Sequence, residues 1–162
     1  MSKMFVRVDD RLIHGQTIVA WCPTLGIQEI IAIDDDSAKN PVLKSILTMG
    51  VPKLYKTHVV TVEEAKDLLA QPSDKNRLVI VKFPSKLNEI KDVIKGCEHV
   101  YLGNMAKRND TTHQMSGATG IFFLSDQDIE DINGMVKEGF NVTFQQLPNA
   151  SGTSWESFIK SI

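Results

Sequence analysis

Cysteine is scarce in this sequence, because Cys22 and Cys97 are the only two among 162 residues. They form no Cys-x-x-Cys pair and have no histidines at zinc-ligand spacing, which argues against a structural metal site. A disulfide between them is one alternative, but we expect a reduced pair, as in cytosolic proteins. The first residues contain no apolar stretch of signal-peptide length, and nowhere do about 18 apolar residues run together. We therefore expect a cytoplasmic protein, and if it works at a membrane, other proteins must hold it there.

Runs of like charge are also missing. The 18 Lys and Arg residues against 20 Asp and Glu give a net charge of −2, with no basic stripe for nucleic acid or a membrane surface. Hydrophobic residues make up 42% and charged residues 23%, which is typical of a folded globular chain rather than a disordered one. This length is enough for one domain, residues 1–162, and we expect no nucleic-acid partner.

Short β-rich runs alternate with helical segments along the chain. Several of the runs are continuously apolar, which is typical of strands buried on both faces of a parallel sheet. The runs cover residues 5–8, 29–33, 58–60, 78–83, 99–102, 120–123 and 141–146. This alternation predicts right-handed βαβ units in a doubly wound α/β domain.

Helix-start signals stand between these runs. Thr61 and Glu64 predict a capping box for a helix over residues 62–69. Ser125 and Asp128 predict a similar start for a helix towards residue 136, which Gly139 can end. A last short helix is expected over residues 154–161, packed on the sheet through its apolar residues.

Ligands of open α/β sheets bind at the carboxyl ends of the strands, near the point where strand order reverses. Among the loops after the predicted strands, the first has the most side chains that can react or bind a ligand. Its sequence is Asp-Asp-Arg-Leu-Ile-His-Gly-Gln, at residues 9–16. A neutral imidazole at His14 has a lone pair that can attack phosphorus without a separate base. Arg11 offers a planar fork of donors for phosphate oxygens, and Gly15 lets backbone amides of a helix start approach closely.

Each of these residues also has a structural interpretation. A loop histidine beside a glycine is commonly a capping or packing residue, and Asp9 is expected to end the strand by bonding backbone amides. His58 and His99 begin strands at the opposite edge, and His113 lies in a polar stretch with the character of a mobile loop, so we interpret all three as surface or packing residues. The acidic residues 34–36 suit magnesium, but a solvated strand end is the commoner use.

Residues 7–16, Arg-Val-Asp-Asp-Arg-Leu-Ile-His-Gly-Gln, resemble the active-site signature of the IIB subunits of the mannose/sorbose family of the bacterial phosphoenolpyruvate-dependent sugar phosphotransferase system. The resemblance runs the length of the chain. It includes Trp21, the acidic strand end at 34–36, the Gly-Asn-Met turn at 103–105 and the Gln-Gln-Leu-Pro segment at 145–148. The first motif is long and specific, whereas the last segment has glutamines where a basic residue is common in relatives.

The resemblance implies a three-layer α/β/α domain with a mainly parallel sheet of about six to seven strands. It implies that His14 takes a phosphoryl group from a phosphohistidine on a IIA protein or domain. His14 then passes the group to a sugar translocated by the membrane-embedded IIC and IID subunits, without metal or cofactor. The chain would be cytoplasmic and peripherally associated with the membrane through IIC and IID. Amino sugars such as N-acetylgalactosamine are the weakly favoured substrate, and a homodimer is left open.

We assign roles within the loop as hypotheses. Arg11, Gly15 and Gln16 are expected to hold the phosphoryl group, and Asp10 to orient the imidazole or to accept the sugar hydroxyl proton. Leu12 and Ile13 are expected to be exposed and to form a rim where IIA docks.

Three other classes of protein fit less well. A response-regulator-like receiver needs an aspartate after the third strand, where this chain has Thr61-Val62-Glu63-Glu64. A Rossmann or P-loop nucleotide module needs glycine motifs that are missing. A non-catalytic binding domain gives the clustered Asp10, Arg11 and His14 no purpose.

Overall fold

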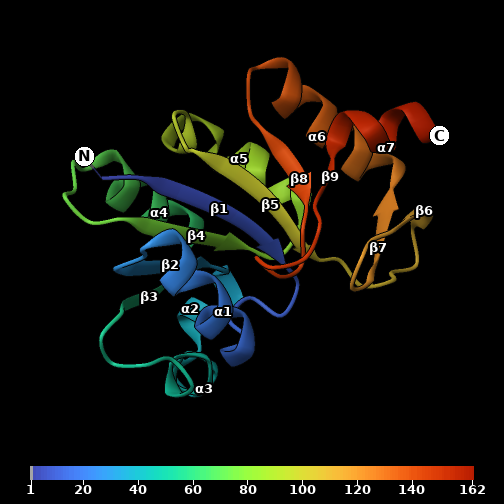
Figure 1. The fold of residues 1–162 in the computed structure, drawn as a ribbon. Coiled ribbons are helices and arrows are strands. Elements are labelled where there is room, and N and C mark those ends of the chain that lie inside the picture. The colour runs from blue at the N-terminus through green and yellow to red at the C-terminus, as the bar shows by residue number, and fades with distance from the viewer. Residues whose placement is uncertain (1) are drawn as a thin grey trace.

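A seven-stranded sheet forms the centre of the molecule, in the order β3-β2-β4-β1-β5-β8-β9 (Figure 1). The computed structural model describes residues 2–162. The strands of the sheet are β1 (Met4–Asp9), β2 (Glu29–Ile33), β3 (Lys56–Val60), β4 (Arg77–Val81), β5 (His99–Asn104), β8 (Val142–Phe144) and β9 (Thr153–Ser154). Neighbouring strands pair in parallel except β9, which runs antiparallel to β8.

Helices cover both faces of this sheet, which makes three layers (Figure 1). They are α1 (Gly15–Leu25), α2 (Asp35–Lys39), α3 (Pro41–Met49), α4 (Val62–Ala70), α5 (Pro84–Ile94), α6 (Asp126–Lys137) and α7 (Trp155–Ser161). One apolar core lies between the sheet and α4 to α7, and the other contains the buried face of α1. The predicted α/β/α architecture is therefore confirmed.

The predicted helix signals are present as hydrogen bonds. The Thr61 hydroxyl accepts from the Glu64 amide, and the Glu64 carboxylate accepts from the Thr61 amide, so the capping box is confirmed. Ser125 and Asp128 form the same reciprocal pair at the start of α6. Gly139 follows α6 with φ 98°, a conformation that glycine adopts without steric cost.

Residues 111–125 differ from the prediction. The run at 120–123 does form a strand, β7 (Ile121–Ser125), but it pairs with β6 (Thr111–Ser116) in a separate antiparallel hairpin. The interpretation of the stretch around His113 as a mobile loop is wrong, because His113 lies within β6. β6 buries only Met115, so its polar sequence does not look like a strand.

The chain reverses its direction of travel across the sheet at β1 and β5. β1 leads through α1 to β2 on one side, whereas β5 leads through the hairpin and α6 to β8 on the other side. The carboxyl ends of these two neighbouring strands form the topological switch point at which open α/β sheets bind ligands. Within residues 2–162, no helix has the length and apolar character needed to cross a membrane.

Candidate active site

The loop between β1 and α1 turns sharply after Asp9. The Leu12 amide donates to the Asp9 carbonyl at 2.9 Å, and Leu12 has a left-handed backbone with φ 64°. This conformation is strained for a residue with a side chain, by roughly 1–2 kcal/mol. The turn delivers the chain to His14, which is the extended N-cap residue of α1. The histidine therefore stands at the positive end of a helix dipole.

His14 caps α1 without a side-chain hydrogen bond. Its ring is half-buried, and Nδ1 is buried with no hydrogen-bond partner among the described residues. The first turn of α1 contains no acidic residue, and Gly15 and Gln16 are exposed. Uncapped amides at a helix start are suited to bind an anion, and these lie next to the imidazole.

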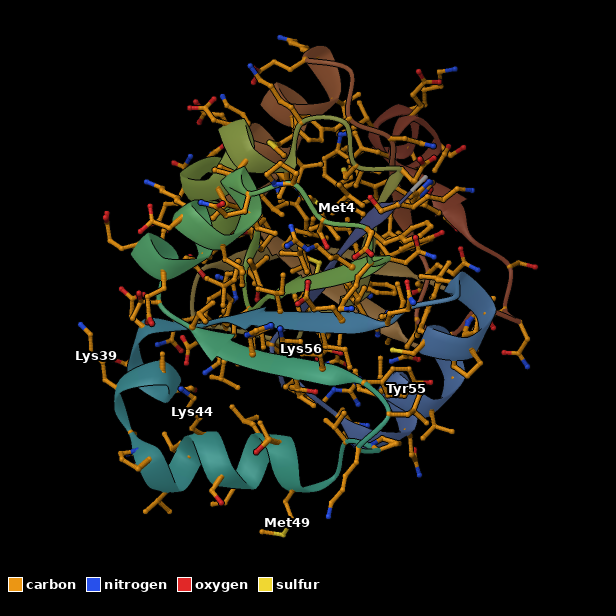
Figure 2. All side chains as sticks on the ribbon, turned by 90° about the vertical axis from the view of Figure 1, so that its left-hand side faces the viewer. Met4, Lys39, Lys44, Met49, Tyr55 and Lys56 are labelled. Carbon is orange, nitrogen blue, oxygen red and sulfur yellow. The ribbon has the colours of Figure 1, made fainter. Side chains whose placement is uncertain are left out.

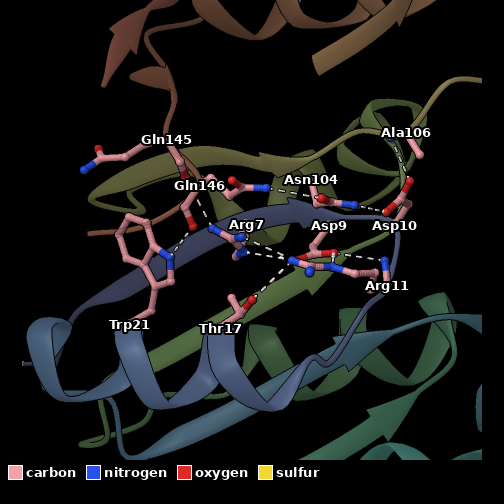
Figure 3. A network of polar contacts seen from close by, with 10 residues as sticks. All are labelled: Arg7, Asp9, Asp10, Arg11, Thr17, Trp21, Asn104, Ala106, Gln145 and Gln146. Carbon is pink, nitrogen blue, oxygen red and sulfur yellow. Dashed lines mark hydrogen bonds and ion pairs between the residues drawn. The ribbon is translucent and has the colours of Figure 1, made fainter. Parts of the chain in front are cut away.

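Two arginines share the Asp9 carboxylate (Figure 3). Arg7 donates to Asp9 Oδ2 from Nε at 3.4 Å and from Nη2 at 3.3 Å. Arg11 donates from Nε to Asp9 Oδ1 at 3.1 Å and from Nη2 to Asp9 Oδ2 at 3.0 Å. Two guanidinium groups thus pair with the single carboxylate of Asp9 at the carboxyl end of β1.

Asp9 also performs its expected structural role. Its Oδ1 accepts from the Arg11 amide at 2.9 Å, which ends the strand by bonding backbone as predicted. The second Nη2 bond of Arg11 goes to the Thr17 hydroxyl at 3.2 Å, so the guanidinium bridges the loop and the first turns of α1. The Arg11 side chain remains 35% exposed, and an incoming group can therefore reach it.

Arg7 is almost completely buried, with 1% of its surface exposed. Burial lowers the pKa of Arg7 to about 10, against the opposing attraction of Asp9. The guanidinium lies 5.5 Å from the ring centre of Trp21, and its Nη1 donates to the Gln145 carbonyl at 3.4 Å. The indole Nε1 of Trp21 in turn donates to the Gln146 carbonyl at 2.9 Å (Figure 3). The segment after β8 is thus tied to the buried cation.

Sequence reasoning gave Arg7 no role, although a charged residue inside an apolar strand run was a usable signal. Gly103 was also missed as a functional residue. It has no partner on β1, because the pairing shifts from Val8 with Leu102 to Asp9 with Asn104, and a methyl group at Gly103 would overlap the Arg7 guanidinium.

Asp10 does not contact the imidazole as expected. Its Oδ1 accepts from Asn104 Nδ2 at 2.5 Å and its Oδ2 from the Ala106 amide at 2.9 Å (Figure 3). No hydrogen bond to His14 is present among the described residues, so the predicted orienting bond is not formed. Asp10 instead fixes the loop after β1 to the end of β5.

The predicted exposure of Leu12 is wrong. The side chain is 1% exposed and belongs to the core beneath α1, and Ile13 is only partly buried against that core. The left-handed turn at Leu12 directs this side chain inwards, which hydrophobicity alone does not reveal. A docking rim formed by the exposed pair of Leu12 and Ile13 is therefore excluded.

The remaining polar candidates serve local structure. Asp34 caps α2 by accepting from the Ser37 amide and hydroxyl, and Asp35 accepts from the Val62 amide. Within residues 2–162, no group of three or more His, Cys, Asp and Glu side chains lies together as a metal site would require. His58 forms a hydrogen bond with Glu29, and His99 forms side-chain hydrogen bonds with Thr143 and Asn141. Neither of these histidines therefore contributes to the site around His14.

The comparisons with known proteins agree with this geometry. The family model described as PTS system sorbose subfamily IIB component matches residues 3–162. The chain belongs to this family. The receiver, Rossmann and non-catalytic alternatives are therefore set aside.

Two curated relatives illustrate the IIB family. A probable phosphotransferase enzyme IIB component of Streptococcus pyogenes is 33% identical over 104 residues, which are 63% of this chain and 64% of that protein. The mannose-specific EIIAB component of Escherichia coli is 27% identical over 144 residues, 87% of this chain and 43% of that protein. The chain thus spans less than two thirds of the length of these relatives.

Solved IIB structures have the same fold. The IIB domain of the sorbose permease from Klebsiella pneumoniae has a TM-score of 0.87 at 23% identity, covering 100% of this chain and 99% of that one. The N-acetylgalactosamine-specific IIB component 1 from Escherichia coli has a TM-score of 0.83 at 20% identity, covering 94% of this chain and 99% of that one. At this identity, the likeness shows the fold.

Proposed function

We propose that this IIB component accepts a phosphoryl group on His14 from a phosphohistidine of IIA and transfers it to a sugar. The observation that carries the proposal is the position of His14, at the uncapped start of α1 and at the switch point of the sheet, in the same loop as the partly exposed guanidinium of Arg11. A phosphoryl group has a charge of about −2, and a helix N-terminus with a neighbouring guanidinium stabilises such an anion.

The first transfer exchanges one N–P bond for another. An imidazole nitrogen of His14 uses its lone pair to form the bond to phosphorus, while the N–P bond on the donor breaks and its electron pair returns to the donor imidazole. Arg11 and the amides of Gly15 and Gln16 are the proposed contacts of the three equatorial oxygens. The reaction then consists mainly of alignment and charge stabilisation.

In the second transfer a sugar hydroxyl oxygen forms the bond to phosphorus and the His14 N–P bond breaks. The hydroxyl proton passes to a base or to water. Asp10 can act as that base only after its hydrogen bonds from the Asn104 side chain and the Ala106 amide break and it accepts from the sugar hydroxyl instead. Asp9 is excluded from this role because it is buried between two arginines.

The partners follow from the same proposal. A relative named EIIAB supports a IIA donor, and membrane IIC and IID subunits would present the sugar. The chain would then act at the cytoplasmic face of the membrane. The relatives are named for mannose, sorbose and N-acetylgalactosamine, so the proposal leaves the sugar open and the preference for amino sugars stays a prediction.

The test is phosphorylation with phosphoenolpyruvate, the general phosphotransferase proteins and the cognate IIA, followed by mass spectrometry under non-acidic handling. We expect an acid-labile phosphate on His14 that is lost in His14→Ala. His113→Ala is the matched control, because His113 is also partly exposed but lies on β6. A phosphate on another residue, or none from an active donor, would overturn the proposal.

A further inference from the structure

Thr17 is a buried polar residue in the first turn of α1. The helix follows its N-cap residue His14, so Thr17 is the third helical residue, and only 5% of its surface is exposed. The N-cap residue and the third helical residue of a helix are close neighbours, which is why the two can bond reciprocally in a capping box. Thr17 therefore belongs to the same turn of the chain as the imidazole of His14.

The hydroxyl of Thr17 bonds outside its own helix. A threonine within a helix commonly donates to the carbonyl one turn back, as Thr24 does to Ala20 at 3.1 Å in the same helix. Within residues 2–162, Thr17 forms no bond of this kind. Its Oγ1 instead accepts from Arg11 Nη2 at 3.2 Å (Figure 3). The polar atom that the fold buries here thus serves the arginine and not the helix.

Arg11 is held by two attachments on different elements. Asp9, at the end of β1, accepts from Arg11 Nε at 3.1 Å and from Nη2 at 3.0 Å, and Thr17 accepts the other Nη2 hydrogen. Within residues 2–162, Arg11 Nη1 has no hydrogen-bond partner, so both of its N–H groups remain for an incoming anion. Asp9 alone would fix the guanidinium to the sheet. Thr17 fixes it to the helix that begins after His14.

We propose that Thr17 is a positioning residue for phosphoryl transfer, because its hydroxyl holds the Arg11 guanidinium at the start of α1 with Nη1 towards the phosphoryl group on His14. The inference rests on the proposed function, in which Arg11 contacts the equatorial oxygens. The bonds that form and break remain those of the proposed transfer, and Thr17 neither gains nor loses a proton. A displacement of such a group by about 1 Å can cost up to a hundredfold in rate.

Valine has the branched shape of threonine and lacks the acceptor, so Thr17→Val removes this one bond. The Arg11 side chain is 35% exposed, and water can therefore satisfy its N–H group without fixing its position. The melting temperature of Thr17→Val should stay within about 4 °C of the parent protein. A stable fold with a slower transfer is the result that separates positioning from a structural role.

The test measures the initial rate of His14 phosphorylation over a range of phospho-IIA concentrations, with the cognate IIA as the probe. In Thr17→Val we expect kcat to fall about tenfold. KM should stay within about twofold, because Thr17 is buried and cannot contact the donor protein. Thr17→Ser retains the hydroxyl and should recover most of the parental kcat.

A double variant shows whether Thr17 acts through Arg11. Arg11→Ala has already lost the guanidinium, so adding Thr17→Val should slow transfer by less than a further factor of about two. If the two losses multiplied instead, Thr17 would act independently of Arg11 and the inference would be wrong.

The matched control is Thr57→Val. Thr57 is half-buried, and its hydroxyl also forms a hydrogen bond, to the Tyr55 carbonyl at 3.3 Å, but it lies near the amino end of β3. Figure 2 shows Tyr55 where this strand begins. Both kcat and KM of Thr57→Val should stay within about twofold of the parent.

An unchanged kcat in Thr17→Val, or an equal loss in Thr17→Ser, would overturn the inference and leave the proposed function intact. If the parent protein accepted no phosphate on His14, the proposed function itself would fail.

Discussion

Gly103 lies where β5 passes the buried guanidinium of Arg7. A methyl group at this position would overlap Arg7, which is itself fixed by Asp9 and lies over Trp21. In Gly103→Ala, Arg7 has to move, and we expect the free energy of unfolding to fall by about 1–3 kcal/mol. Because Arg7 shares Asp9 with Arg11, transfer to His14 should also slow. Urea unfolding and the rate of phosphorylation measure the two effects.

Gly134 provides the control for this substitution. It lies inside α6, and a methyl group there would meet no atom within 4 Å. Gly134→Ala should therefore stabilise the protein by roughly 0.5–1 kcal/mol, through helix propensity and a less flexible unfolded chain. Equal effects of the two substitutions would contradict the account of Gly103.

At the residue scale, the sequence predicts His14 and Arg11 together because they lie in one short loop. The contact of Arg7 with Gly103 was not predictable, since it depends on how β1 aligns with β5. The register between β1 and β5 shifts at Gly103, and the sequence around this residue has no pattern that predicts the shift. The inward direction of Leu12 depends in the same way on one left-handed dihedral angle.

α6 depends on the capping box at its start. The Ser125 hydroxyl accepts from the Asp128 amide at 3.0 Å, and Asp128 in turn forms an ion pair with Arg108. Ser125→Ala should lower the free energy of unfolding by about 1 kcal/mol, because one helix amide loses its partner. Urea denaturation at neutral pH measures the loss.

Ser85→Ala is the comparison for Ser125→Ala. Ser85 is an exposed residue in the first turn of α5, whose N-cap has no side-chain hydrogen bond. Its replacement should change the free energy of unfolding by less than about 0.5 kcal/mol. A similar loss in both variants would show that the serine hydroxyl, and not the cap, carries the effect.

At the element scale, helices with caps and buried strands were predictable because their signals are local. The hairpin of β6 and β7 was not predictable, because β6 has a polar sequence and pairs with a single strand, β7. The same holds for α3, whose apolar stripe predicts a buried helix where the fold leaves it exposed.

Considered as a whole, the molecule has the buried Glu29 network near one end of its strands and the proposed active site at the other end. Glu29 accepts from Arg77 Nε at 2.8 Å and bonds to His58 Nε2 at 3.0 Å, near the amino ends of β2 to β4. His14 follows the carboxyl end of β1, so it lies at the opposite end of the strands from Glu29. A change at Glu29 should therefore affect stability and leave phosphoryl transfer by the folded protein unchanged.

Glu29 makes this stability dependent on pH. Burial raises the pKa of Glu29, but the bonds from His58 and Arg77 outweigh it and hold the pKa below its ordinary value of 4.5. A carboxylate with a lowered pKa in the folded state contributes stability above its unfolded pKa, and this contribution is lost as pH falls through the folded value. Glu29→Gln should thus cost about 1–3 kcal/mol at pH 7. The cost should shrink towards pH 3 in urea unfolding, whereas exposed Glu98→Gln should show little cost at either pH. An equal cost of Glu29→Gln at both pH values would mean that shape, and not charge, holds these three strands together.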